Sequence, residues 1–172
     1  MKKMFGRKVE EEIRNICGDF NIKIDKNGIW YYQGTPIRRK SLIKLFSSIL
    51  TKDNKGVYWL TTPYERGTIE VDDVPFIVVE MKNRGVGTLQ EIDFMTNIDS
   101  QIPLGPKYEL WLESKANVGR DLPYIDTGKG LFARLSRNIF YQLIDLGEVI
   151  EGHNESCLRI WSRGKSFRLG SF

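Results

Sequence analysis

Histidine and cysteine are scarce in this chain of 172 residues, which has one histidine and two cysteines. The single histidine, His153, removes two-histidine metal sites and most catalytic triads from consideration. Two cysteines, Cys17 and Cys157, exclude a disulfide scaffold and a multi-cysteine zinc site. The sequence also shows no nucleophile paired with a base, and this argues against catalysis.

Long apolar runs are absent as well. No apolar stretch approaches the roughly 20 residues that a membrane-spanning helix needs. The N-terminus is charged from Lys2 onward, before any apolar segment that could serve as a signal peptide. We therefore expect a cytoplasmic protein with reduced thiols and no membrane partner. A hydrophobic share of 41% is typical of a folded soluble protein and too high for disorder.

Positive charge is concentrated at the C-terminus, although the net charge of the chain is only +4. The segment Ser156 to Phe172 contains Arg159, Arg163, Lys165 and Arg168 and no acidic residue. Such a local positive field favours a phosphate, a nucleotide or nucleic acid. The structural alternative is that these cations form the solvated face of a strand pair, and both interpretations stay open.

Helices and a hairpin are predicted in the first half. The spacing of apolar residues predicts an amphipathic helix from Arg7 to Cys17 and a second from about Arg38 to Leu50. The pair Asn27-Gly28, between apolar runs at 22–24 and 29–33, indicates a tight hairpin. Branched and aromatic residues predict further strands at Val57–Thr61, Thr68–Val71 and Phe76–Met81.

The second half begins with a glycine-containing loop, Asn83–Gly87, which is the candidate domain boundary. Strands are predicted at Ile92–Met95, Tyr108–Leu112 and Leu122–Ile125. Gly128-Lys129-Gly130 then leads into a predicted helix with Leu131, Leu135, Ile139, Phe140, Leu143 and Ile144. A terminal hairpin, with strands Leu158–Trp161 and Phe167–Leu169, completes the chain.

The two halves share a pattern that suggests duplication. An arginine precedes an apolar helical stripe in both halves, at Arg39 and at Arg137. Each predicted helix is followed by a strand that contains a tryptophan, Trp59 or Trp161. We therefore expect an α+β fold of two small modules, 1–82 and 83–172, each with a duplicated helix-plus-antiparallel-sheet core. The two arginines would then approach a shared cleft, a favoured place for small-molecule sites.

An ordered series of short motifs carries a family resemblance from about residue 22 to the C-terminus. The series in the first half comprises Gly28-Ile29-Trp30, Gly34-Thr35-Pro36-Ile37-x-Arg39-x-x-Leu42, Leu45-Phe46-Ser47, Gly56-x-Tyr58-Trp59-Leu60-x-Thr62-Pro63-x-Glu65-Arg66-Gly67 and Ile69-x-Val71-x-Asp73-x-Pro75-Phe76. The second half continues it with Phe94-x-Thr96-Asn97, Pro123-Tyr124, Gly130-Leu131-x-Ala133, Arg137-x-x-Phe140-Tyr141 and Trp161-Ser162-x-Gly164. With these motifs the chain resembles the bacterial domain-of-unknown-function family numbered 1285.

This resemblance implies a two-module α+β fold whose C-terminal module is similar to pleckstrin-homology domains. It also implies a nucleotide-like ligand at the module interface and a role in signal transduction, with no established reaction. The chain departs from the family pattern at Gly128 and Phe132, where an arginine and a glutamate are expected. Lys129 or Arg134 is the candidate substitute for that arginine.

We predict a non-catalytic binder of a small anionic, nucleotide-like ligand, with no cofactor and no metal. The candidate ligand-binding residues are Arg39, Thr62, Glu65, Asp73, Thr96, Asn97, Tyr124, Lys129 and Arg137. In this interpretation the cations neutralise phosphate, Tyr124 stacks, and Thr96 with Asn97 donates and accepts hydrogen bonds. Each residue also has a structural alternative: internal ion pairs for the arginines, turns for Thr96-Asn97 and Gly128–Gly130, and core packing for the aromatic residue.

Two other functions remain open from the sequence. One is a metal-dependent nucleotide hydrolase that uses Glu65 or Asp73, because carboxylates bind divalent cations. Asp72 and Asp73 are adjacent on a predicted strand and point to opposite faces, which makes them a poor chelating pair. The other is nucleic-acid binding through the basic C-terminal hairpin, where Trp161 and Phe167 alternate with cations. The sequence does not identify a protein partner.

Overall fold

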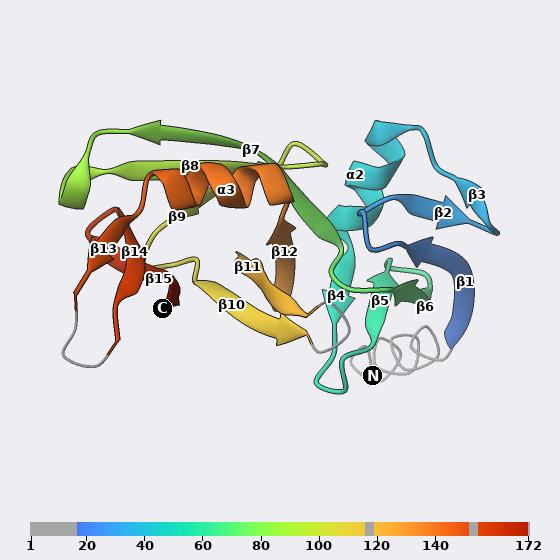
Figure 1. Cartoon of the computed structure of the whole chain (residues 1–172). Coiled ribbons are helices and arrows are strands. Elements are labelled where there is room, and N and C mark those ends of the chain that lie inside the picture. The colour runs from blue at the N-terminus through green and yellow to red at the C-terminus, as the bar shows by residue number, and fades with distance from the viewer. Residues whose placement is uncertain (1–16, 116–118, 152–154, 172) are drawn as a thin grey trace, which may run out of the picture. The chain divides into compact units, whose positions relative to one another are not determined.

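The computed structural model describes residues 17–115, 119–151 and 155–171 (Figure 1). The predicted helix at Arg7–Cys17 and the loop around His153 fall outside the described residues, apart from the positions at their ends. By their internal contacts, residues up to Val74 form one unit and residues from Pro75 form a second, and each unit is described by itself. The sequence places this boundary after residue 82, within a strand that runs without a break from Phe76 to Arg84.

The N-terminal unit is built on one six-stranded sheet with the order β3-β2-β1-β6-β5-β4. Strands β1 and β6 pair in parallel, and the other neighbours are antiparallel (Figure 1). The predicted hairpin joins β1 to β2, with Gly28 at φ +75°, a backbone conformation that a glycine adopts without strain. The elements are β1 Cys17–Ile24, β2 Trp30–Tyr32, β3 Thr35–Pro36, α2 Lys40–Ser48, β4 Leu50–Lys52, β5 Tyr58–Thr61 and β6 Arg66–Val71.

Helix α2 forms where the apolar spacing predicts it, but it packs loosely. None of its residues is buried, and Leu45 is exposed. The core of this unit instead comes from the strands, with Ile24, Trp30, Leu50 and Leu60 almost fully buried. Helix α2 therefore lies beside the sheet with its apolar side chains only partly covered.

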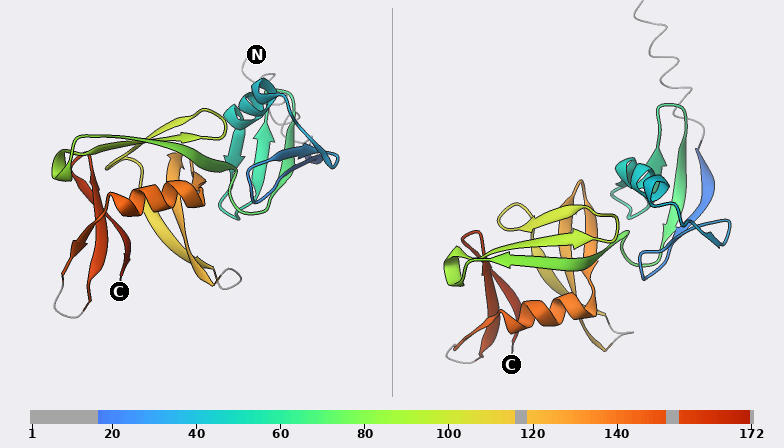
Figure 2. Two further views of the ribbon diagram at one scale, coloured as in Figure 1. Left: turned by 45° about the horizontal axis from the view of Figure 1, so that its top comes forward. Right: turned by 90° about the horizontal axis from the view of Figure 1, so that it is seen from above.

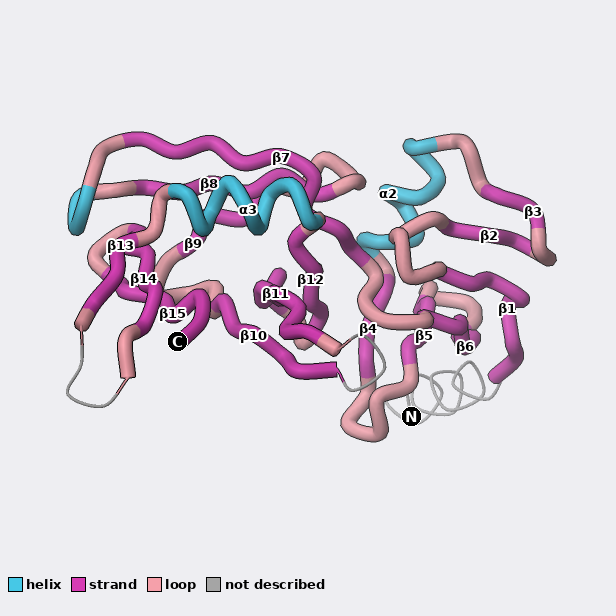
Figure 3. Tube along the Cα trace, viewed as in Figure 1, coloured by secondary structure: helices cyan, strands magenta, loops and turns pink. Residues whose placement is uncertain are grey.

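The C-terminal unit contains two sheets. Six strands pair in the order β10-β11-β12-β7-β8-β9, with β12 and β7 parallel, and β13-β14-β15 form a second, antiparallel sheet (Figures 1 and 3). The elements are β7 Phe76–Arg84, the 3-10 helix η1 Gly87–Leu89, β8 Glu91–Thr96, β9 Gln101–Leu104, β10 Leu110–Lys115, β11 Arg120–Gly128, β12 Leu131–Leu135, α3 Arg137–Asp145, β13 Glu148–Ile150, β14 Cys157–Ser162 and β15 Lys165–Ser171.

The turn between β14 and β15 joins the two sheets of this unit. The hydroxyl of Ser162 is fully buried, donates to the carbonyl of Leu104 at 2.7 Å and accepts from the amide of Ile92 at 3.0 Å. Next to it, the Arg163 guanidinium donates to the carbonyls of Ile92 and Leu104, at 2.8 and 3.0 Å, and to the Asp93 carboxylate at 2.6 Å. These buried bonds hold the terminal hairpin against β8 and β9.

Helix α3 packs against β7 and β14 in the same unit (Figure 2). Its apolar face is packed in the core of the unit, because the side chains of Ile139 and Leu143 are only 2% and 0% exposed. The two helices are both nine residues long, yet only α3 contributes to a packed core.

The predicted fold class is wrong. The described residues hold fifteen strands against two α-helices, so the protein is mostly β and not α+β. The duplicated helix-plus-sheet core is not found, because one unit has a single six-stranded sheet and the other has a six-stranded and a three-stranded sheet. A pleckstrin-homology-like C-terminal module does not follow from this arrangement either. The shared arginine and apolar stripe reflect only a local helical pattern.

The predicted helix start at Gly128–Gly130 is also wrong. These residues form the tight turn between β11 and β12, with positive φ at all three positions. Leu131, Ala133 and Leu135 are buried alternately, which is the period of a strand, and the helix begins only at Arg137. Among the described residues, no helix is both long and apolar enough to cross a bilayer.

Candidate functional site

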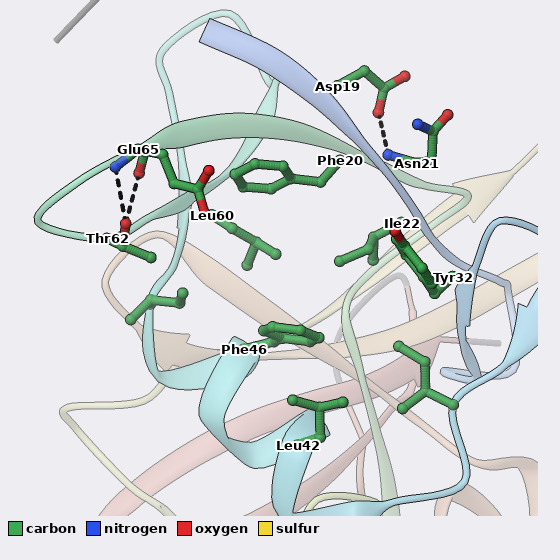
Figure 4. A pocket seen from close by; sticks show the side chains of 12 residues that line it. Asp19, Phe20, Asn21, Ile22, Tyr32, Leu42, Phe46, Leu60, Thr62 and Glu65 are labelled. Carbon is green, nitrogen blue, oxygen red and sulfur yellow. Dashed lines mark hydrogen bonds between the residues drawn. The ribbon is translucent and has the colours of Figure 1, made fainter. Parts of the chain in front are cut away.

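A hollow of about 560 Å³ lies in the N-terminal unit between α2 and strands β1, β2 and β5 (Figure 4). Leu42 and Phe46 point from α2 toward Phe20, Ile22 and Leu60 on the strands. The complete lining is Asp19, Phe20, Asn21, Ile22, Tyr32, Ile37, Leu42, Phe46, Ile49, Leu60, Thr62 and Glu65. Two of the predicted ligand-binding residues, Thr62 and Glu65, therefore meet at an apolar surface.

Thr62 and Glu65 are positioned by the turn between β5 and β6. The hydroxyl of Thr62 accepts from the amides of Tyr64 and Glu65, at 3.2 and 3.0 Å, and donates to the carbonyl of Glu65 at 3.1 Å. This closed turn fixes the backbone of Glu65 at the border of the hollow. The Thr62 hydroxyl thus holds the turn together, while the Glu65 carboxylate is left exposed beside the hollow.

A second cavity, of about 310 Å³, lies in the C-terminal unit beside the start of α3. Its lining comes from β11, β12 and α3 and combines two arginines with two aromatic rings and one carboxylate. The lining residues are Asp121, Leu122, Pro123, Arg134, Leu135, Ser136, Arg137, Phe140 and Tyr141. Arg137 is the one predicted ligand-binding residue in this cavity.

Arg137 occupies the first position of α3, after the N-cap Ser136. Its Nε donates to the hydroxyl of Tyr141 at 3.1 Å, and its guanidinium lies 5.7 Å from the centre of that ring. No acidic residue stands in the first helical turn, and the Ser136 side chain makes no capping hydrogen bond. The N-terminus of a helix is the positive end of its dipole, so the dipole disfavours the positive charge of Arg137 there. An anion placed at this end would be attracted by both the guanidinium and the helix dipole.

Arg39 and Asp73 lie in the N-terminal unit, apart from the residues that line the hollow. Arg39 is the N-cap of α2, and its Nε donates to the hydroxyl of Ser41 at 3.2 Å. Asp73 is half-buried in the segment between β6 and β7. Arg39 and Arg137 are thus both at helix starts, as predicted, but in different units.

Thr96 and Asn97 make internal hydrogen bonds at the end of β8. Thr96 is buried, and its hydroxyl accepts from the amide of Ser100 at 3.1 Å. The Asn97 side-chain oxygen accepts from the amide of Ile77 at 3.1 Å, and the Asn97 amide donates to the carbonyl of Ile77 at 2.8 Å. These bonds anchor the β8–β9 turn to β7 and correspond to the structural alternative for this pair.

Tyr124 is enclosed in an aromatic cluster on β10, β11 and β12. The ring is 2% exposed, stacks on Trp111 at 5.9 Å and lies 5.1 Å below the ammonium of Lys115. Phe132, at a position where the family resemblance implies a glutamate, meets the edge of Trp111 at 5.0 Å. The cluster uses the ring of Tyr124 for packing, and the exposed Lys129 lies at the tip of the neighbouring turn.

The basic C-terminal segment is largely paired with acids of its own unit. Arg163 binds Asp93, Lys165 lies 3.4 Å from Glu109, and Arg168 lies 3.0 Å from Glu155. A hydrogen bond from Ser171 and the nearby Arg168 lower the pKa of Glu155 below its ordinary value. Much of the positive field expected from the sequence is therefore neutralised within the unit.

Acidic residues of the N-terminal unit are also engaged in hydrogen bonds and ion pairs. The Lys23 ammonium lies between Glu70 and Asp72, at 2.7 and 2.8 Å, and hydrogen bonds to Asp72 and then Glu70 raise its pKa. Asp53 accepts from the indole N–H of Trp59 at 2.9 Å and from the amides of Val57 and Lys55, which lowers its pKa. In the part of the chain that the structure describes, no group of three or more His, Cys, Asp or Glu residues could hold a metal ion.

Sequence reasoning missed most residues of the two cavities. Asp19 and Phe20 precede the strand predicted at 22–24, and Tyr32 falls in the strand predicted at 29–33. Only their closeness to α2 in the folded unit makes them part of a site. Asp121 and Tyr141 were missed for the same reason, since β11 and α3 meet only in the folded unit. The signal available in the sequence was the apolar stripe of α2, which the N-terminal unit does not bury.

Comparisons with known proteins agree with the motif series. Residues 9–74 match the family model described as "Domain of unknown function (DUF1285), N-terminal domain", and residues 75–169 match "Protein of unknown function (DUF1285), C-terminal domain". A search of curated proteins found no match.

Two solved structures are similar to this chain. A DUF1285 family protein from Silicibacter pomeroyi has 36% sequence identity and a TM-score of 0.80, over 88% of this chain and 80% of that one. A DUF1285 family protein from Shewanella baltica, at 24% identity and a TM-score of 0.57 over 72% of this chain and 90% of that one, shares the fold. The motif series and the two matching family models lead to one conclusion: the chain belongs to the DUF1285 family.

Proposed function

We propose that the protein is a non-catalytic binder of a small anionic, nucleotide-like ligand and acts in signal transduction or regulation. The observation that carries this proposal is the cavity of about 310 Å³ at the start of α3, where Arg134 and Arg137 lie beside Tyr141 and Asp121. A binder that does not consume its ligand responds to the ligand's concentration, which is the property that a sensor needs.

Phosphate recognition is assigned to Arg137 and the first turn of α3. The bond from Nε to Tyr141 orients the guanidinium, and its two terminal nitrogens remain able to bind phosphate oxygens in parallel. The first amides of a helix have no acceptor within the helix and form the positive end of its dipole. Arg134, from the neighbouring strand β12, adds a second cation to the lining.

The rest of a nucleotide fits the remaining lining. The rings of Phe140 and Tyr141 offer apolar surfaces on which a base can stack. The Asp121 carboxylate would repel a bare phosphate but can accept a hydrogen bond from a ribose hydroxyl. The volume lies at the lower end of the range for ligand pockets, so a mononucleotide fits better than a dinucleotide.

The test is a melting-temperature screen of the full chain against AMP, ADP and cyclic AMP, followed by calorimetric titration. A ligand at about 100 times its Kd raises the melting temperature of a chain of this size by about 5 to 10 °C. Arg137→Ala should leave the fold intact and abolish this rise, because Arg137 is exposed. An unchanged binding isotherm in that variant would refute the proposal.

Arg39→Ala is the matched control, since Arg39 also stands exposed at a helix start. It should bind the nucleotide as the parent chain does. Equal loss in both variants would overturn the assignment of the site to α3 alone. Release of phosphate from a nucleotide in the presence of Mg²⁺ would favour a hydrolase, and steeply salt-dependent binding of oligonucleotides would favour a nucleic-acid binder.

A further inference from the structure

The hollow under α2 is open to solvent and has the size of a small-molecule site. The space here is about 560 Å³, within the range of small-molecule sites, and α2 turns Leu42 and Phe46 toward it without burying either. An amphipathic helix that leaves its apolar face half-exposed has room for a further apolar group.

The walls of the hollow are held in place by contacts behind them. Phe20 on β1 lies over Gly67 on β6, so closely that a Cβ added at Gly67 would be 2.8 Å from the ring. Phe46 stacks on Trp30 at 6.2 Å and 22° between the planes, and Trp30 is fully buried in the core. These contacts, on the side away from the hollow, give both rings a defined position in the parent chain, so binding needs little reorganisation.

The charge at the border of the hollow is negative. Its lining includes Asp19 and Glu65 and contains no Lys, Arg or His. The structure shows no ion pair for Glu65 or Asp19 with any other described residue. One oxygen of Asp19 accepts from the Asn21 amide at 2.8 Å, and the turn at Thr62 fixes the backbone of Glu65. An apolar surface bordered by two carboxylates is complementary to an apolar molecule with a positive end.

We propose that this hollow is a binding site for an amphiphilic organic cation. The aromatic or aliphatic body of the ligand lies between α2 and the strands, against Phe20, Phe46 and Leu60. Its ammonium group pairs with Glu65, and Asp19 adds to the attraction. This chemistry is opposite to that of the cavity beside α3, so the two sites take different ligands and the inference does not rest on the proposed function.

The experiment compares three compounds that share an indole ring and differ in the polar end: tryptamine, tryptophol and indole-3-acetate. Each is titrated into the full chain by calorimetry, with the Ile and Leu methyl groups followed by NMR. The ring of the ligand should shift the methyl signals of Ile22, Leu42 and Leu60, which line the hollow. Tryptamine should bind about fivefold more tightly than tryptophol, the upper range for an exposed ion pair, and indole-3-acetate should bind most weakly.

Substitutions then separate charge from shape. Glu65→Gln should bring the affinity for tryptamine to within about twofold of that for tryptophol, with tryptophol itself unaffected. Leu42→Trp fills the hollow from α2 and should weaken tryptamine and tryptophol alike. Glu113→Gln, an exposed carboxylate of β10 in the other unit, should change neither. Arg137→Ala should also leave tryptamine binding intact, which distinguishes this site from the nucleotide site.

The proposal is overturned if tryptamine and indole-3-acetate bind equally, or if Glu65→Gln leaves the preference for tryptamine unchanged. Absence of binding by all three compounds would also overturn it. If Glu65→Gln does not fold, the salt dependence decides in the parent chain. Tryptamine affinity must then fall as ionic strength rises while tryptophol affinity stays constant.

Discussion

Helices α2 and α3 have the same length, with an arginine at the N-cap of α2 and at the first position of α3, but they differ in how they pack against their sheets. Helix α3 buries Ile139 and Leu143, whereas the apolar side chains of α2 are at most half-buried and the helix borders a hollow of about 560 Å³. An apolar stripe determines which face of a helix turns inward. Whether that face is filled depends on the side chains opposite, and in the N-terminal unit they leave space.

The largest expected effect comes from truncating one apolar side chain on the inward face of each helix. Leu143→Ala should destabilise the C-terminal unit by about 2 to 5 kcal/mol, because Leu143 is fully buried and the substitution leaves a cavity. Leu42→Ala should lower the free energy of unfolding of the N-terminal unit by only about 1 kcal/mol, since Leu42 already faces an open space. Urea unfolding followed by NMR signals of each unit measures both. Equal losses would mean that α2 is as tightly packed as α3.

A smaller effect is expected when a methyl group is added at two glycines. A Cβ at Gly147 would lie 2.9 Å from Leu158 and 3.1 Å from the carbonyl oxygen of Ile144, in a packed turn after α3. Gly147→Ala should therefore destabilise the protein by about 1 to 3 kcal/mol.

For a Cβ added at Gly67, the three nearest atoms all belong to the Phe20 ring, at 2.8 Å, and this ring borders the hollow and can be displaced into it. Gly67→Ala should be milder in thermal unfolding than Gly147→Ala, and it should weaken tryptophol binding because the displaced ring occupies the site. A Gly67→Ala variant as unstable as Gly147→Ala would show that Phe20 has no room to move.

The smallest effect is the pH dependence carried by two carboxylates, one in each unit. Asp53 and Glu155 have lowered pKa values in the folded protein, so the unfolded chain binds their protons more readily. Their contribution to stability is complete above the ordinary carboxyl pKa and is lost as pH falls through the lowered values. Urea midpoints between about pH 5 and about pH 2 should fall less steeply in Asp53→Asn than in the parent chain. An identical slope would mean that the hydrogen bond from Trp59 does not favour the charged form.

Much of the local structure was predictable because it depends on neighbours in the chain. The hairpin at Asn27-Gly28, the helix within 38–50 and the terminal hairpin all appear where the sequence indicates them. The helix predicted from Leu131 was wrong in its first part, because Leu131 and Leu135 fit a helical spacing as well as a strand alternation. Strands such as β9 lay in segments without a clear periodic signal. Because short strands such as β9 were missed, the sequence predicted an α+β fold where the structure is mostly β.

The candidate site was predictable only in fragments. Arg137, Thr62 and Glu65 were singled out from sequence and line cavities in the structure. Thr96 and Asn97 make internal hydrogen bonds at a turn, Tyr124 stacks on Trp111, and their binding of a ligand stays a prediction. A polar residue in a sequence looks the same whether it binds a ligand or completes the hydrogen bonding of its own chain.

By itself, the sequence determined the positions of turns and the inward faces of the helices, because a residue's backbone preference and the spacing of apolar side chains act over a few neighbours. The tertiary structure alone decided the parallel pairing of β1 with β6 and of β7 with β12, which joins residues far apart in the chain. It also decided that α2 leaves a hollow and α3 does not. The volume between two elements depends on all the side chains that meet there, and those meet only after folding.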